Sequence, residues 1–139
     1  MNYTNVWKGI KESTAKLEGM ARDVDAAGRE IVVKGAALVI TYAQQNFAGA
    51  HAKGQPHIET SNGGPNIVTG DLRRSIIMDP IVRLGFSEYM TQIGPTMVYG
   101  RAVELGLKNG ANYPYFGPAV EKAMPEIDAI SAETWARLV

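Results

Sequence analysis

Two histidines and a glutamate are the residues that could supply chemistry within one short segment. They are His51, His57 and Glu59. Imidazole and carboxylate groups bind zinc or act as a general base, so a metal site or a base is the chemistry they would provide. Their spacing matches neither the pairing of zinc ligands on a helix nor that of a zinc finger. We therefore expect two solvated loop histidines.

Other catalytic patterns are missing from the sequence. No serine stands in a G-x-S-x-G turn, and Gly63-Gly64-Pro65 lacks the lysine and the helix of a phosphate-binding loop. The chain has no cysteine, which excludes a disulfide, a thiolate metal site and a cysteine nucleophile. We expect a protein that is not an enzyme and that holds no cofactor or metal.

Composition narrows the function classes. The 139 residues predict a single domain over 1–139, and 14 basic residues balance 14 acidic ones. A protein that coats nucleic acid usually has a basic excess, so zero net charge disfavours that class. The N-terminus is polar, and the longest apolar stretch, residues 35–40, falls far short of the ~20 residues of a membrane helix. We expect a soluble protein without an export leader.

The elements that must position these residues begin with a long helix. Apolar residues recur at a spacing of three and four from Val6 to Tyr42, which predicts a helical arm over residues 1–48. Asp23 and Asp25 fall on its polar side, where we expect them to be solvated. A hairpin turning at Lys34-Gly35 is the alternative, but the helical period continues past it.

The length of this helix and its glycines raise a question. Gly28 and Gly35 lie in the apolar stripe, so another element approaches closely there, or the helix breaks near Gly28. One helix from Val6 to Phe47 would span ~60 Å, whereas a compact chain of this size is about 37 Å across. The helix must therefore bend, break or project onto a neighbouring subunit.

The rest of the chain predicts a long loop and a small α+β body. Residues 49–70 are rich in glycine and proline, and we expect this loop to take its order from a partner. The body, residues 71–139, has expected antiparallel strands at 72–78, 81–84 and 89–93 and a short helix at 96–106 with Gly106 as its C-cap. Asn109-Gly110 predicts a turn. A last helix opens at Pro118, and Pro125 should kink or split it.

Three segments carry a resemblance to a known family. They read PNIVTGDLRRSI at 65–76, YGRAVELG at 99–106 and YPYFGPAV at 113–120. Their order and spacing resemble the small neck or tail-completion proteins of long-tailed bacteriophages. The matching positions are Thr69, Gly70, Leu72, Arg73, Arg74, Glu104, Gly106, Pro114, Phe116 and Pro118. The chain departs from the family at Tyr113 and Gly117, where arginine is frequent, and at Tyr115, where phenylalanine is usual.

The resemblance implies a structural virion protein of the head–tail connection. Such a protein forms a homo-oligomeric ring, six-fold in expectation, between the head-closure or connector proteins and the tail-terminator or tail-tube proteins. Duplex DNA passes nearby without specific binding, and assembly takes place in the host cytoplasm. Alternatives within the same connector are the tail terminator and the head-closure ring. A more distant one is a small nucleic-acid-associated protein.

The motif residues also suggest contacts. Neighbouring residues of a strand point to opposite faces, so one of Arg73 and Arg74 can meet a partner while the other faces water. We expect one of them to pair with Glu104. Arg83 and Arg101 would add to a basic surface. The loop 49–70 is expected to contact a neighbouring ring.

Overall fold

The computed structural model describes residues 3–107 and 111–138. Its elements follow one another as α1 (Tyr3–Gln45), α2 (Asp71–Arg74), β1 (Ile76–Met78), β2 (Val82–Gly85), β3 (Glu88–Met90), β4 (Ile93–Pro95), α3 (Gly100–Leu105) and α4 (Gly117–Ala136). The chain is α+β, as the sequence predicts. The expected Asn109-Gly110 turn lies outside the described residues.

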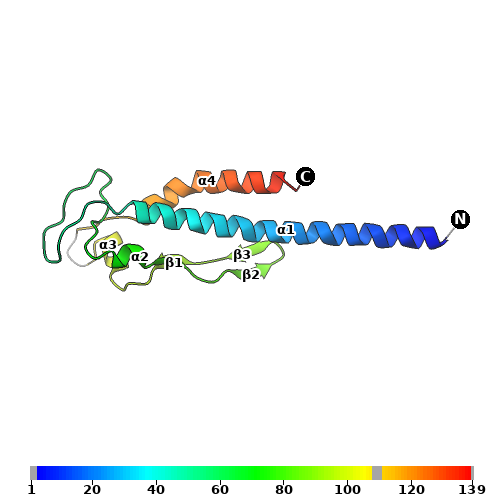
Figure 1. Cartoon of the computed structure of the whole chain (residues 1–139), viewed down its shortest axis with the longest axis horizontal. Coiled ribbons are helices and arrows are strands. Elements are labelled where there is room, and N and C mark those ends of the chain that lie inside the picture. Colours follow the sequence, from blue (N-terminus) through cyan, green and yellow to red (C-terminus); the bar gives the residue numbers. More distant parts are fainter. Residues whose placement is uncertain (1–2, 108–110, 139) are drawn as a thin grey trace.

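Helix α1 is unbroken over 43 residues and extends for roughly 65 Å. Figure 1 shows α4 along one side of α1 and the strands along the other, while the N-terminal part of α1 projects beyond both. The expectation of a break near Gly28 is therefore wrong. The helix is longer than the body, and its N-terminal part projects beyond the body.

The two glycines of α1 each allow another element to approach closely. A Cβ atom at Gly28 would lie 2.3 Å from the Ser87 carbonyl oxygen, which belongs to the turn between β2 and β3. A Cβ at Gly35 would lie 3.4 Å from the Ile127 side chain of α4. The sequence analysis gave close approach and a break as alternatives, and the structure has the first of them.

Helix α4 packs antiparallel to α1. Ala36 and Ala43 of α1 and Ala119 and Ala123 of α4 are buried, and such small side chains let two helices lie close. Arg137 donates to both carboxylate oxygens of Glu30 at 2.9 Å and so ties the end of α4 to the middle of α1. The helix continues through Pro125, so the expected split does not occur.

The strands form two small antiparallel pairs, and β2 lies within one residue of the expected strand 81–84. In one pair β1 faces β4, with Ile77 opposite Gly94. In the other β2 faces β3, with Val82 opposite Met90 and a register irregularity before Gly85. The expected strand 89–93 is divided, because its residues contribute to both pairs.

The expected strand 72–78 is also wrong in its first half. Gly70 has a left-handed backbone with φ of 80°, and the Thr69 hydroxyl accepts the Asp71 N–H at 3.2 Å. This local geometry starts the short helix α2, which places Leu72 inward, and only then does the chain extend into β1.

The hydrophobic core lies where the C-terminal end of α1 meets α2, β1 and the start of α4. Its buried members are Ala43, Phe47, Leu72, Ile76, Tyr115 and Ala119. The rings of Phe47 and Tyr115 lie 5.0 Å apart at a tilt of 53°. Within residues 3–107 and 111–138, no helix is both long enough and apolar enough to cross a bilayer.

Candidate functional site

The three motif segments meet at the C-terminal end of α1, and Glu104 joins two of them. Its Oε2 accepts the backbone N–H groups of Tyr115 at 2.7 Å and Phe116 at 2.9 Å. Its Oε1 accepts the N–H of Gly117, the first residue of α4, at 2.8 Å. A carboxylate at this position satisfies N–H groups that have no partner within the helix and complements the helix dipole. Glu104 therefore fixes the start of α4.

Tyr115 anchors the same corner from the inside. Its hydroxyl donates to the Gly100 carbonyl at 3.0 Å, and its own carbonyl accepts from Asn46 Nδ2 at 2.8 Å. Burial, followed by the nearby Glu104 charge, raises the pKa of Tyr115 to about 12. A Cβ on Gly100 would lie 2.5 Å from Pro95 Cγ, which explains a glycine at this position of the second motif. A phenylalanine at this position would lack the hydroxyl bond.

The first motif closes a turn around α2. Arg74 donates to the Asp71 carboxylate at 2.7 Å and to the Thr69 carbonyl at 3.2 Å. A Cβ on Gly70 would lie 2.6 Å from the end of the flexible Arg74 side chain, which can move, so the glycine is needed for its positive φ. The motif residues at 69–74 thus make contacts with one another.

Arg73 faces α1. Its Nε donates to the Gln44 carbonyl at 3.1 Å, and Gln44 Nε2 donates back to the Arg73 carbonyl at 3.4 Å. The last turn of α1 has no basic residue of its own, so Arg73 supplies a cation to that helix end from elsewhere in the chain.

The expected ion pair between Glu104 and Arg73 or Arg74 is not formed within the chain. All three side chains are already engaged, Glu104 by backbone amides and the two arginines by α1 and by the α2 turn. The argument from strand geometry fails because residues 71–74 are helical. Arg83 does not add a free positive charge to the expected basic surface, because it forms an ion pair with Asp25 at 3.0 Å.

The remaining motif residues have local roles. Gly106 caps α3 in the left-handed conformation with φ of 68°, as predicted, and its N–H donates to the Ala102 carbonyl at 2.8 Å. Pro118 stands in the first turn of α4, where its missing N–H costs nothing. Phe116 packs against the core, and Pro114 is half-buried beside it. The ten motif residues therefore build a junction within the chain.

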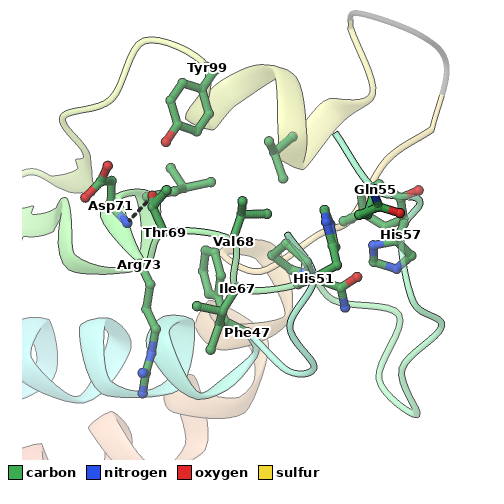
Figure 2. A pocket seen from close by; sticks show the side chains of 16 residues that line it. Phe47, His51, Gln55, His57, Ile67, Val68, Thr69, Asp71, Arg73 and Tyr99 are labelled. Carbon is green, nitrogen blue, oxygen red and sulfur yellow. Dashed lines mark hydrogen bonds between the residues drawn. The ribbon is translucent and has the colours of Figure 1, made fainter. Parts of the chain in front are cut away.

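A hollow of about 370 Å³ opens beside this junction, and Figure 2 shows its lining. The His57 ring stacks on the Tyr113 ring, with centroids 3.8 Å apart, and His51 Nδ1 lies 2.8 Å from the Ala52 carbonyl. Arg73 points away from the hollow towards α1. Within the described part of the chain, no three histidine, aspartate or glutamate side chains are grouped so that they could hold a metal ion.

The long loop 49–70 is tied together by its own residues. Asn66 Nδ2 donates to the carbonyls of Ala48 and Ile58, and its Oδ1 accepts the Ile58 N–H at 2.6 Å. Ala50 and Ile67 form an isolated parallel bridge. These bonds connect the two sides of the loop. That the loop takes its order from a partner and that it contacts a neighbouring ring both stay predictions.

Asp25 holds the β2–β3 hairpin onto α1, whereas its place on the polar side of the helix predicts a solvated side chain. Its carboxylate accepts from Tyr89 Oη at 2.5 Å, from the Ser87 N–H at 2.8 Å and from Arg83 Nε at 3.1 Å. Hydrogen bonds from Tyr89, Ser87 and Arg83, in that order, lower the pKa of Asp25 to about 2. The side chain is thus not simply solvated, and its partners come too late in the chain for any local pattern to indicate them.

The projecting part of α1 exposes one apolar face. We call residues 4–20 the arm and the side chains of Val6, Trp7, Ile10, Leu17 and Met20 the arm stripe. These five side chains are 44–70% exposed. The arm stripe belongs to the periodic pattern from which the sequence predicts the helix, but only the structure separates the uncovered part from the covered part.

A second apolar surface lies on the β2–β3 hairpin. Val82, Leu84 and Met90 are 43–54% exposed, and we call them the hairpin face. Arg83 and Tyr89 bind Asp25 on α1, and alternate residues of a strand point to opposite sides. Val82, Leu84 and Met90 therefore point away from α1.

Comparisons with known proteins add nothing to the resemblance that the three motif segments carry. The chain matches no family model, and neither the search of curated proteins nor the search of solved structures finds a match. The three motif segments are the basis of the family resemblance.

Proposed function

We propose that this chain is a structural protein of the phage head–tail connection. It forms a homo-oligomeric ring in the virion neck, between the head-closure and tail proteins, and is needed to join or complete the tail. Its function lies in contacts between subunits, without a catalytic site or cofactor.

The projecting arm is the observation that carries this proposal. A 17-residue helical segment that leaves five large apolar side chains exposed is marginal by itself in water. Exposed apolar patches of this kind mark surfaces that bind other proteins. A subunit with such an arm is suited to assembly with neighbours.

The charge arrangement supports passage of DNA without tight binding. Arg74, Arg83 and Arg137 are each engaged by a carboxylate of the same chain. Charges that are paired in this way release few counterions from a duplex, so they contribute little to DNA affinity. A filter-binding assay at physiological salt should therefore detect little binding to duplex DNA. Tight, salt-dependent binding would favour the nucleic-acid alternative and overturn the neck proposal.

The decisive experiment removes the protein from the infection. In phage that carry a nonsense mutation in the coding sequence, we expect DNA-filled heads and tails of normal length to accumulate unjoined. Adding the purified chain to the lysate should restore infectious particles. Normal virions without the protein would refute the proposal. Overlong tails would indicate a terminator and emptied heads a closure protein, and either result would replace the neck assignment.

A further inference from the structure

We infer that the arm stripe of one subunit docks on the hairpin face of a second copy of this chain. The inference rests on the proposed ring, because it names the surfaces through which neighbouring subunits join. Four observations on the two surfaces support it.

The first observation is that the arm stripe continues a helix face that the body already covers. Ile10, Leu17 and Val24 are seven residues apart, so they lie on nearly the same side of α1. Gly28 lies on that side too, and the turn between β2 and β3 packs against it. The side of α1 that the β2–β3 turn covers is therefore continuous with the side that the arm leaves open.

The second observation is the extent of the two surfaces. The arm rises by ~25 Å from residue 4 to residue 20. Its stripe exposes on the order of 600 Å² of apolar side chain, at the upper end of what a monomer usually leaves uncovered, and the hairpin face adds on the order of 300 Å². Together the two come close to the ~1,000 Å² of total buried area from which specific interfaces begin, and their polar margins add to it.

The third observation is the charge beside each surface. Lys11 and Lys16 flank the arm stripe, with Glu18 beside Lys11, and the described residues give neither lysine an ion-pair partner. Glu88 alternates with Tyr89 along β3 and so shares the outward side with Met90. Asp79 lies at the other end of the hairpin, and the described residues give it no ion-pair partner. The two lysines of the arm and the two carboxylates of the hairpin therefore have complementary charges.

The fourth observation is that the two surfaces lie at different places on the subunit. An arm that docked on another arm would use the stripe twice and leave the hairpin face bare. An arm that docks on a hairpin uses both surfaces once per subunit. Such a contact is heterologous and continues from copy to copy until it closes into a ring.

Sedimentation of the full chain with single substitutions tests this inference. We expect the wild-type chain to assemble, and Leu17→Glu on the arm and Leu84→Glu on the hairpin each to sediment as a monomer. A 1:1 mixture of the two variants should give dimers that grow no further, because each variant keeps one intact surface. Ala15→Glu, on the opposite side of the arm, should assemble like the wild type.

Three results would overturn the inference. They are a wild-type chain that stays monomeric at several hundred micromolar, full assembly of Leu84→Glu, or a mixture of the variants that stays monomeric. Circular dichroism shows whether each variant keeps its helices, and both sites are exposed, so folding should persist.

Disulfide formation provides a second measurement, because the chain has no cysteine of its own. A mixture of Ile10→Cys and Leu84→Cys chains should cross-link to each other under mild oxidation, and Ala15→Cys should not cross-link to Leu84→Cys. Ile10→Cys chains that cross-link only among themselves would indicate arm–arm pairing and refute the inference. The neck proposal would survive that result, since the nonsense-mutant phenotype does not depend on which surfaces join.

Discussion

Replacing Glu104 by glutamine tests whether this side chain acts as the cap of α4. Glutamine keeps the shape but places an amide oxygen on one side and an NH₂ group on the other. If the oxygen takes the place of Oε2, it still accepts from Tyr115 and Phe116, but as a neutral acceptor. The NH₂ group then faces the Gly117 N–H, donor against donor.

The magnitude follows from these three bonds. Hydrogen bonds to a charged group contribute ~1.5–3 kcal/mol each, and neutral ones roughly half as much. Glu104→Gln weakens two bonds and loses the third, which water can partly replace because the Gly117 amide is exposed. We expect a loss of about 3 kcal/mol in the free energy of unfolding, and about 5 kcal/mol for Glu104→Ala. The smaller loss corresponds to a fall in Tm of about 10 °C.

Urea unfolding followed by circular dichroism measures this loss at one fixed protein concentration. Glu121→Gln is the matched control, since Glu121 lies on the exposed side of α4, and it should change stability by less than ~0.5 kcal/mol. A Glu104→Gln protein as stable as this control would refute the capping role.

Three further predictions follow from particular contacts. Gly28→Ala should lower the free energy of unfolding by ~1–3 kcal/mol because its Cβ would meet the Ser87 carbonyl. Gly9→Ala has open space around it and should raise the free energy of unfolding by ~0.5–1 kcal/mol. Urea midpoints of the two variants that shift in the same direction would contradict this prediction. The pKa of Asp25, lowered to about 2 from 3.8, means that its carboxylate stabilises the fold fully above about pH 4 and loses this effect as the pH falls towards 2. Urea midpoints of Asp25→Asn should therefore vary less between pH 4 and pH 2 than those of the wild type, and parallel curves would count against the role of Asp25. Tyr115→Phe should cost about 1 kcal/mol and remove the tyrosine that titrates near pH 12, which ultraviolet absorbance detects; an unchanged titration would show that Tyr115 is not buried as described.

Periodic patterns predicted the elements, because they depend on residues close in sequence. The apolar spacing of three and four carries α1 correctly past Lys34-Gly35, and Gly106 ends α3 as expected. A glycine at position 28 favours a break on local grounds, since glycine weakens a helix relative to alanine. The residue that explains Gly28 is Ser87, which only the fold brings next to α1.

The site residues were predicted as a group but not in their contacts. The motif segments do come together, and the bonds that they make run mostly to backbone atoms, which no pattern of side-chain types reveals. An acid and a base in neighbouring motifs suggested an ion pair. Glu104 instead binds amides at the start of α4, and that start is defined only once Tyr115 has packed in the core.

The straight, uninterrupted course of α1 has a metric consequence. Each residue advances the helix by 1.5 Å, and seven residues return the stripe to within about 20° of its starting side. Deleting residues 7–13 would bring whatever the arm tip holds about 10 Å closer to the body with almost the same facing. Deleting only two residues would turn that side away by about 200°. If the arm joins two subunits, its residue count sets their spacing, and changes of seven residues alter that spacing by about 10 Å without changing the side that faces the neighbour.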